Sequence, residues 1–502
     1  MFRIRKTYAL LSILFCLSII LYVLSGCSMK NIIFSDETAQ TIESKEDNEP
    51  LDQNQVQITM TYYGSEIANA QQVEKTFDEI IMIYAKKTKI FVTFNFMTTD
   101  SVRSWMITQY AAGIIPEIIE TKRVWAWEDY TKGLIHNLTQ YLEAESSYCP
   151  TVKWKDVFSP AIFQQTIDPA NNVSACVPFQ VVTGKIIYNK QLFARAGIDE
   201  EPKTWQEYIN ACKLLKEAGI VPFGFANSKM SDNDFHWLLS SIFGQLDESL
   251  RKKMDVDGDG QIIKNEQVRA TDLGLIDFSK TPFIEGFELV KELSKYFDDD
   301  FNSIDRKTNM DKWLRGEVAM ITLGSWEVIA IESMEDRGFE YGVLSSPLIT
   351  KDTNIYASGK LTVIGGSPVD SFSISKRTQG EKLSVAVDFL QFLTSAEIQE
   401  KLAKDLYYIP VFKDADSPEI IKRFMVQENE DILRSNYTGA ATSQEFSDFL
   451  SRMGQLYLAD KINFSIFSSE LNVEWKKAMD NAKVTNNWSE DNNYGMLIRN
   501  NG

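Results

Sequence analysis

The segment Val177-Pro-Phe-Gln-Val-Val-Thr-Gly-Lys-Ile-Ile-Tyr-Asn-Lys-Gln-Leu-Phe-Ala-Arg-Ala-Gly197 decides which fold this chain can have. Apolar and β-branched residues dominate from Val177 to Ile187, which predicts a buried strand interrupted only by Pro178 and Gly184. A helix is predicted over residues 189–196, and Gly197 is placed to end it. A buried strand that bends at a glycine fits a crossing between two lobes. It fits an ordinary strand–helix unit of an α/β core equally well.

The composition indicates a globular protein large enough for more than one domain. The chain has 502 residues, of which 44% are hydrophobic and 24% charged. Its net charge is −18, and loss of the basic residues Arg3, Arg5 and Lys6 with a leader segment would make it −21. Because so negative a surface repels phosphate backbones, we expect no nucleic-acid partner.

Cysteine and histidine are too sparse for a zinc site. The five cysteines are Cys16, Cys27, Cys149, Cys176 and Cys212; none form a CxxC pair, and the chain has two histidines. Cys149 and Cys176 either form a disulfide or remain buried thiols, and the second interpretation is favoured.

The N-terminus has the pattern of an exported protein. Three basic residues precede an uncharged apolar run from Thr7 to Gly26, long enough to cross a bilayer. The run ends in Leu24-Ser25-Gly26-Cys27, which resembles a bacterial lipobox with Cys27 as the lipidated residue. We therefore predict a lipoprotein signal peptide over 1–26, with an uncleaved transmembrane anchor as the alternative. The polar, acidic stretch that follows predicts a disordered tether within 27–55.

The next part of the chain alternates between strand and helix patterns. Residues 56–63, 90–96 and 116–119 read as strands, and helical patterns lie between them. This βαβαβ order predicts a parallel sheet with helices on both faces. Ligands of such sheets bind at the carboxyl ends of the strands, which here are the stretches after Tyr63 and from Glu120 to Trp127.

The most specific local motif is Asp255-Val-Asp-Gly-Asp-Gly-Gln-Ile-Ile-Lys-Asn-Glu266, which has the spacing of an EF-hand loop. We predict a structural Ca²⁺ site, since this spacing wraps several oxygens around one point. Ile263, at the ninth position, offers no polar side chain, which predicts weaker binding. The alternative is an acidic, solvated turn. The predicted ligands are the side chains of Asp255, Asp257, Asp259 and Glu266 and the backbone carbonyl of Gln261.

Several motifs occur in the order found in one family. They include Tyr188-Asn-Lys190, Pro202-Lys-Thr-Trp205, the stretch Gly316–Trp326 and the stretch Leu390–Glu397. With these motifs the chain resembles the extracellular solute-binding lipoproteins of carbohydrate ABC importers, the family 1 or maltose-binding-protein-like type. Large members of this class include some with an EF-hand-like loop.

The resemblance implies an α/β fold of the two-lobe, periplasmic-binding-protein type (type II). Each lobe would be a sheet flanked by helices, and hinge crossings would join the lobes. Lobe one would comprise 56–180 and 325–374, and lobe two 181–324 and 375–502. The protein would be a monomer held by its lipid on the extracellular side of the cell membrane, of the Gram-positive type rather than periplasmic. It would pass a sugar, more plausibly an oligosaccharide, to permease subunits.

A sugar site combines aromatic platforms with planar polar groups. Candidates at strand ends, in the crossings and at the start of a lobe-two helix satisfy this requirement. They are Tyr63, Glu120, Arg123, Trp125, Trp127, Gln180, Thr183, Trp237, Trp326, Gly366 and Tyr407.

Two other functions stay open. A glycan-active enzyme would use two spaced carboxylates, but the chain has no HExxH, nucleophile or phosphate-loop motif. A calcium-dependent adhesin, or a binder that serves a sensor, is the second alternative. We expect no catalytic residues.

Overall fold

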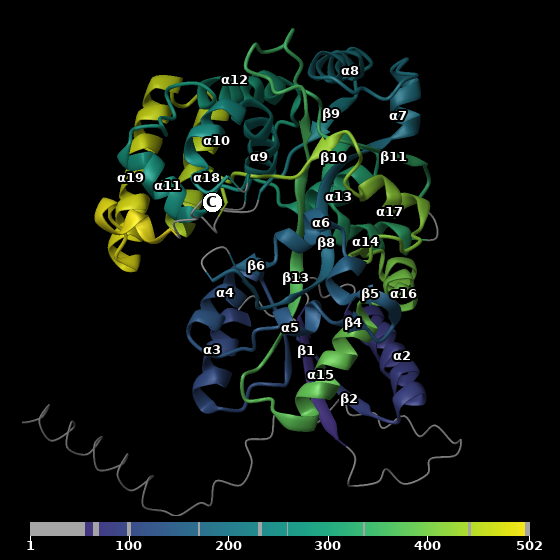
Figure 1. Ribbon diagram of the computed structural model, residues 1–502. Coiled ribbons are helices and arrows are strands. Elements are labelled where there is room, and N and C mark those ends of the chain that lie inside the picture. Colours follow the sequence, from purple (N-terminus) through teal and green to yellow (C-terminus); the bar gives the residue numbers. More distant parts are fainter. Residues whose placement is uncertain are drawn as a thin grey trace, which may run out of the picture. The chain divides into compact units, whose positions relative to one another are not determined.

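The computed structural model describes residues 56–63, 70–97, 102–168, 171–228, 233–258, 260–334, 337–439 and 443–496 (Figure 1). They lie within one compact unit, Val56–Gly502. The predicted signal peptide at 1–26, Cys27 and the tether at 27–55 lie outside the described residues. Among the described helices, none combines the length and apolarity needed to cross a membrane.

One mixed sheet of nine strands runs through the unit, in the order β2-β1-β3-β13-β8-β10-β9, with β11 and β14 also paired to β8. The first three strands are parallel, as the βαβαβ pattern predicts. The bounds are β1 Gln57–Tyr63, β2 Phe91–Met97, β3 Ile118–Thr121, β8 Val177–Asn189, β9 Val221–Gly224, β10 Val318–Gly324, β11 Tyr341–Leu344, β13 Ile364–Ile374 and β14 Ile409–Pro410. Two-stranded pairs are β4 Glu145–Ser146 with β5 Cys149–Lys153, β6 Ile167–Asp168 with β7 Val173–Ser174, and β12 Leu361–Thr362 with β15 Glu430–Asp431.

Helices cover this sheet and form the C-terminal part of the unit. Thr204 caps α8 with the reciprocal hydrogen bonds of a capping box, as its place before Trp205 predicts. The bounds are α2 Ala70–Thr88, α3 Val102–Ala112, α4 Arg123–Thr131, α5 Thr139–Leu142, α6 Pro160–Gln164, α7 Lys190–Arg195, α8 Trp205–Glu217, α9 Asp234–Leu246, α10 Glu248–Met254, α11 Lys264–Asp272, α12 Phe283–Leu293, α13 Arg306–Leu314, α14 Val328–Glu332, α15 Gly380–Leu393, α16 Ala396–Leu406, α17 Glu419–Phe424, α18 Gln444–Leu458 and α19 Phe464–Asn486. Short 3₁₀ turns are η2 Trp154–Val157, η3 Ser294–Tyr296, η4 Ser325–Glu327 and η5 Glu490–Gly495.

Strand β8 is shared between two halves of the sheet. Up to Gly184 it pairs with β13, and from Gly184 onward it pairs with β10. At the change of partner a side chain has no room, because a Cβ on Gly184 would lie 2.9 Å from Ile364 Cγ2 and 3.2 Å from Trp237 Cε3. The sequence allowed two interpretations of this segment, a core strand or a crossing between lobes. In the structure it is the strand with which both halves of the sheet pair (Figure 1).

Two large apolar clusters fill the halves. One gathers side chains of α8, α9, α12, α18 and α19, with Phe243, Phe287 and Trp475 among its fully buried rings. The other joins β1, α2, β8, α15 and α16 around Phe77, Phe179 and further rings. The fold is thus a two-lobe α/β architecture in which each half has its own core.

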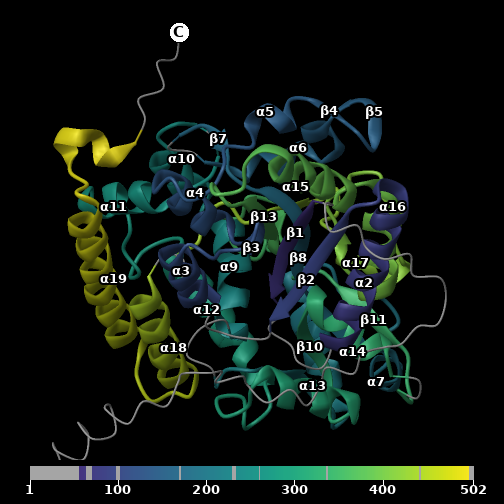
Figure 2. The same cartoon turned by 90° about the horizontal axis from the view of Figure 1, so that it is seen from below.

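Residues 380–406 lie in a different lobe from the one predicted. Tyr84 of α2 donates a hydrogen bond to Asp388 of α15 at 2.8 Å, and Lys401 of α16 pairs with Glu79 at 2.6 Å. Figure 2 shows α2 and α16 side by side. The predicted division gave all of 375–502 to lobe two; α15 and α16 instead cover lobe one, because β13 delivers the chain to the far end of that lobe.

The chain returns to lobe two through β15, which makes a further crossing. Glu430 of β15 forms an ion pair with Lys185 of β8, and the two side chains are 0% and 1% exposed. The hydroxyl of Ser345, which follows β11, also donates to Glu430. This buried charge cluster therefore joins β8, the loop after β11 and the crossing at β15, one residue beyond Gly184.

We predict that Lys185→Met lowers the free energy of unfolding by about 3–5 kcal/mol, since it leaves the Glu430 carboxylate buried without its cation. The double variant Lys185→Met/Glu430→Leu should recover most of that loss. Denaturant unfolding checks both. The control is Lys190→Met, whose 48%-exposed side chain pairs with Glu340 and should cost less than about 1 kcal/mol. Equal losses in the two single variants would contradict the role given to the buried pair.

Candidate functional site

Two tryptophans meet above the crossing. Trp237, in the first turn of α9, and Trp326, in η4 just after β10, have ring centroids 5.5 Å apart and planes inclined at 77°. Trp326 is partly exposed and Trp237 is 8% exposed. The ring of Trp326 packs over Gly324, and Trp237 packs over Gly184. The two glycines therefore let both rings lie directly on the strand backbones.

Arg306 holds this pair in place. Its guanidinium lies over the Trp237 ring, 4.1 Å from the centroid. The same group pairs with Asp234 at 3.0 Å and with Glu327. Glu327 in turn accepts a 2.7 Å hydrogen bond from the backbone N–H of Gly324. Residues from α9, α13 and η4 thus form one charged frame around the aromatic pair.

Charged groups also gather at the carboxyl ends of β1 and β3 in lobe one. Lys122 pairs with Asp370 at 2.6 Å, and its ammonium lies 5.0 Å from the centre of the Tyr63 ring. Glu120 is 1% exposed; one oxygen accepts the N–H of Tyr63 at 2.8 Å, and the other lies 3.9 Å from the ammonium of Lys122 and makes no hydrogen bond with any described residue. Burial, with Asp370 nearby, raises the pKa of Glu120 well above its usual value.

Arg123 follows this cluster as the first residue of α4. Its guanidinium donates to the amide oxygen of Gln165 at 2.8 Å. The same oxygen accepts the hydroxyl of Ser367 at 2.7 Å, and the amide nitrogen of Gln165 donates to the carbonyl of Gly366 at 3.4 Å. Arg123 is therefore tied to β13 beside the crossing.

Three predicted ligand residues are engaged by protein neighbours in this structure. The hydroxyl of Thr183 donates to the carbonyl of Phe424 at 2.6 Å, and its side chain lies on the face of β8 opposite Gln180 because a strand alternates faces. A Cβ on Gly366 would meet Ile432 and Val363 at 2.9 Å, so protein rather than ligand fills that space.

Tyr407 is the third. It ends α16 in a left-handed conformation and packs against the apolar cluster that contains Phe179, on the face of β8 opposite Gln180. Its neighbour Tyr408 exchanges a hydroxyl hydrogen bond with Tyr62 at 2.8 Å. Tyr407 and Tyr408 are thus both partly buried against the lobe-one core.

The remaining predicted residues lie in lobe one. Trp125 is partly buried, with Arg103 5.4 Å from its ring centre. The indole N–H of Trp127 donates to the carbonyl of Thr166 at 3.2 Å. Gln180 is 2% exposed and is paired in register with Asp370.

The acidic loop forms a helix–loop–helix unit between α10 and α11. Oxygens of Asp255, Asp257 and Glu266 lie within 4.8 Å of one another, a spacing that fits ligands of one Ca²⁺. Asp255 accepts the N–H groups of Gly258 and Gly260 at 2.7 and 3.0 Å, which wraps the loop around it. Asp259 lies outside the described residues.

Glu266 closes the loop from the first turn of α11. It is 2% exposed and accepts the N–H groups of Val256 at 2.7 Å and Ile263 at 3.1 Å. The pKa of Glu266 is raised to about 7: burial is the largest cause, the two hydrogen bonds oppose it, and the charges of Asp257 and Asp255 add to it. A cation at this position would favour the charged carboxylate. The donor set therefore fits Ca²⁺.

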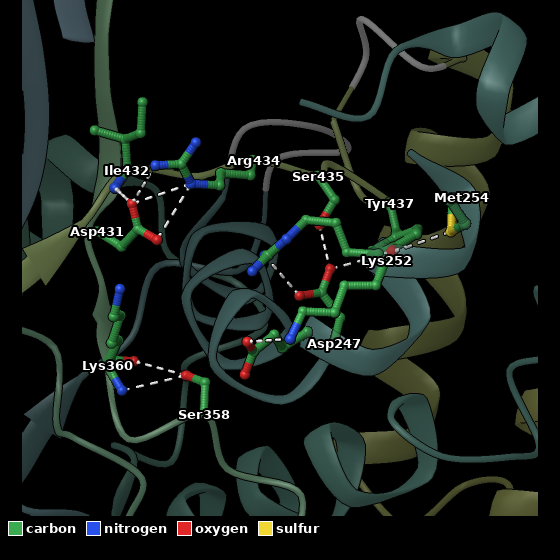
Figure 3. Close-up of polar contacts among 12 residues, drawn as sticks. Asp247, Lys252, Met254, Ser358, Lys360, Asp431, Ile432, Arg434, Ser435 and Tyr437 are labelled. Carbon is green, nitrogen blue, oxygen red and sulfur yellow. Dashed lines mark hydrogen bonds and ion pairs between the residues drawn. The ribbon is translucent and has the colours of Figure 1, made fainter. Parts of the chain in front are cut away.

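The loop is tied to the chain that follows β15. Ile262 donates its N–H to the carbonyl of Arg434 at 2.7 Å. Figure 3 shows Arg434 bonded to Asp431, and Ser435 and Tyr437 bonded to Asp247. Asp247 is fully buried and pairs with Arg251 of α10 at 3.0 Å. The buried carboxylate of Asp247 thus holds the start of α10 to the segment that follows β15.

Comparison with known proteins decides the family. The family model of the bacterial extracellular solute-binding proteins matches residues 79–425. The chain belongs to this family. The match runs from α2 through the crossing strand β8 and both tryptophans to the end of α17, so it includes the elements that build the site.

Curated relatives of this solute-binding protein include periplasmic proteins that bind sn-glycerol 3-phosphate. The one from Salmonella typhimurium is 26% identical over 257 residues, 51% of this chain and 52% of the relative. The one from Escherichia coli K12 is 27% identical over 241 residues, 47% and 49% of the two chains. The match spans about half the length of these relatives.

Solved structures share the fold. A chitin oligosaccharide binding protein superposes with a TM-score of 0.62 and 18% identity, covering 86% of this chain and 99% of that one. A raffinose-bound protein and a maltose-bound protein from T. maritima each give 0.59, with 17% and 18% identity; each covers 84% of this chain, and 100% and 99% of its own. The two-lobe fold predicted for this solute-binding protein is confirmed.

The sequence predicted Glu120 and Arg123 but not the other charged groups of the site. Arg306, Asp234 and Glu327 are far apart in sequence and belong to no motif, and Lys122 and Asp370 are 248 residues apart. Asp234 is the one with a local signal, because it lies in the same first helical turn as Trp237. Cys149 and Cys176 are unpaired, as favoured from the sequence.

Proposed function

We propose that this protein captures a carbohydrate between its two lobes and delivers it to the permease of an ABC importer. The observation that carries the proposal is the pair Trp237 and Trp326, fixed by Arg306 directly above the strand that both lobes share. Aromatic faces bind the CH surfaces of sugars, and the charged groups around them accept and donate hydrogen bonds to hydroxyls.

Binding would close the lobes by shifting a population. Trp237 of α9 belongs to lobe two and Trp326, which the predicted division gave to lobe one, packs against it; Tyr63, Glu120 and Lys122 lie at strand ends of lobe one. A ligand that touches both groups binds the closed form better than the open form and therefore favours closure. The crossings through β8, the end of β10 and β15 are the places where the backbone would bend.

The ligands named for similar proteins support this class. The curated relatives are named for a phosphorylated polyol, and the solved neighbours for chitin oligosaccharide, raffinose and maltose. All are rich in hydroxyl groups, as the polar and aromatic groups here require. Family membership also favours binding without turnover over the glycan-active enzyme. The adhesin or sensor-coupled alternative would lack a permease partner.

We predict that Trp326→Ala weakens binding of the best glycan from an oligosaccharide panel about 10- to 100-fold, the loss expected for one aromatic platform. Isothermal calorimetry measures it, and product analysis of the same mixtures tests for turnover. The control is Trp488→Ala, a partly buried tryptophan that packs near the C-terminus. Unchanged affinity in Trp326→Ala would remove this residue from the site.

We also propose that the helix–loop–helix unit binds Ca²⁺ as a structural ion. Asp255, Asp257 and Glu266 would hold it with side-chain oxygens, joined by Asp259 and the carbonyl of Gln261. The bound ion would neutralise the negative charge of these carboxylates. The acidic, solvated turn is disfavoured by the burial of Glu266.

The calcium proposal predicts a pH-dependent stabilisation. In EDTA, stability should fall as pH rises from about 4.5 to about 7, because the folded state holds a proton on Glu266 that the unfolded state has already released. Ca²⁺ should remove this fall and raise the melting temperature most above pH 7. Thermal unfolding in EDTA and in Ca²⁺ across this range checks it. Glu266→Gln should lose both effects, and no response of the native protein to either reagent would refute the site.

A lipid on Cys27 would hold the protein on the extracellular side of the membrane, as the lipobox-like sequence Leu24–Cys27 suggests. We predict that Cys27→Ala moves the protein from the membrane fraction to the medium. Cys149→Ala, which leaves the lipobox intact, should stay with the membrane. Membrane retention of Cys27→Ala would show that an uncleaved apolar segment is the anchor.

A further inference from the structure

Arg123 is a charged group that the protein itself leaves without a counter-ion. Its side chain is only partly exposed, and its one hydrogen bond goes to a neutral amide oxygen, that of Gln165. Among the described residues, no carboxylate forms an ion pair with it. That amide oxygen is shared with the hydroxyl of Ser367, so it offers the guanidinium little compensation. Four of its five N–H donors remain for another acceptor.

Nearby groups do not neutralise this charge. Lys122 takes up Asp370 in a 2.6 Å ion pair. Glu120 lies 3.9 Å from the same ammonium and is paired with it. Burial raises the pKa of the Cys176 thiol to about 12, so it stays neutral. The carboxylates at these strand ends are therefore both paired with Lys122, and among the described residues none is paired with the guanidinium of Arg123.

The helix that begins at Arg123 adds to the same field. Helix α4 has nine residues, and no side chain caps its N-terminus, where Lys122 is the N-cap. The N-terminal end of a helix carries a partial positive charge and normally favours acidic side chains or anions. Asp370 compensates Lys122 at this end, whereas no described carboxylate compensates Arg123.

We propose that the ligand carries an anionic group, a carboxylate or a phosphate, which binds to the guanidinium of Arg123 at the N-terminus of α4. This inference rests on the proposed function and narrows its substrate class to acidic glycans or sugar phosphates. The hydrogen bond of Gln165 to the carbonyl of Gly366 places Arg123 beside the crossing. A ligand that reaches from Arg123 toward the aromatic pair would then contact both lobes.

Matched acidic and neutral probes test the proposal on the detergent-extracted full chain. The pairs are digalacturonate with galactobiose, and glucose 1-phosphate with glucose, so the carboxylate and phosphate arms are separate. In calorimetry, an acidic member should bind at least 10-fold more tightly than its neutral partner. Arg123→Gln should weaken that binding about 10- to 100-fold. Arg195→Gln, at an exposed arginine of α7, should leave it unchanged.

Thermal unfolding without ligand separates binding from a structural role. Arg123→Met keeps the aliphatic length and removes an uncompensated charge, so its melting temperature should equal or exceed that of the native chain. A drop of several degrees, or failure to fold, would assign Arg123 to the scaffold and overturn the proposal. The proposal would also be overturned if the acidic probes bound no more tightly than their neutral partners. It would equally be overturned if Arg123→Gln bound the acidic probes as tightly as the native protein does. Tight binding of neutral glycans alone would defeat this inference and leave the proposed function intact; no binding of any glycan or acid would defeat both.

Discussion

The change of partner along β8 is the constraint on which the rest of the structure depends. A single strand serves both halves of the sheet, and at Gly184 the neighbouring side chains of Ile364 and Trp237 leave no space for a Cβ. One residue later, Lys185 is buried against Glu430 from the return crossing. Backbone continuity, close packing and a buried ion pair therefore coincide at one place. Any motion of the lobes has to be accommodated around it.

This arrangement explains why the candidate site lies where it does. The aromatic pair packs on the glycines at the end of β10 and in the middle of β8, so it sits on the backbone that would bend. Arg306 connects the pair to Asp234 and Glu327, and this frame fixes the rings before any ligand arrives. The opposing groups of lobe one come from strand ends, where loops and helix N-termini leave polar groups available.

The sequence predicted the fold well because its signals are local or ordered along the chain. The apolar run at Val177–Ile187, the cap at Thr204 and Gly324 at the end of β10 each specify backbone geometry within a few residues. Proximity to a crossing does not say on which face of the sheet a side chain lies, so whether Thr183 and Tyr407 touch ligand stays a prediction. Charge clusters such as Arg306 with Glu327 arise only from long-range packing and have no sequence pattern.

The central claim is that ligand draws the two lobes together around the crossing. Electron-spin distance measurement between labels on α3 and α19, at the exposed positions of Thr108→Cys and Lys477→Cys, tests it most directly. The account predicts that a saturating ligand shifts the distance distribution to a shorter and narrower one. An unchanged distribution with ligand bound would contradict closure as the mechanism.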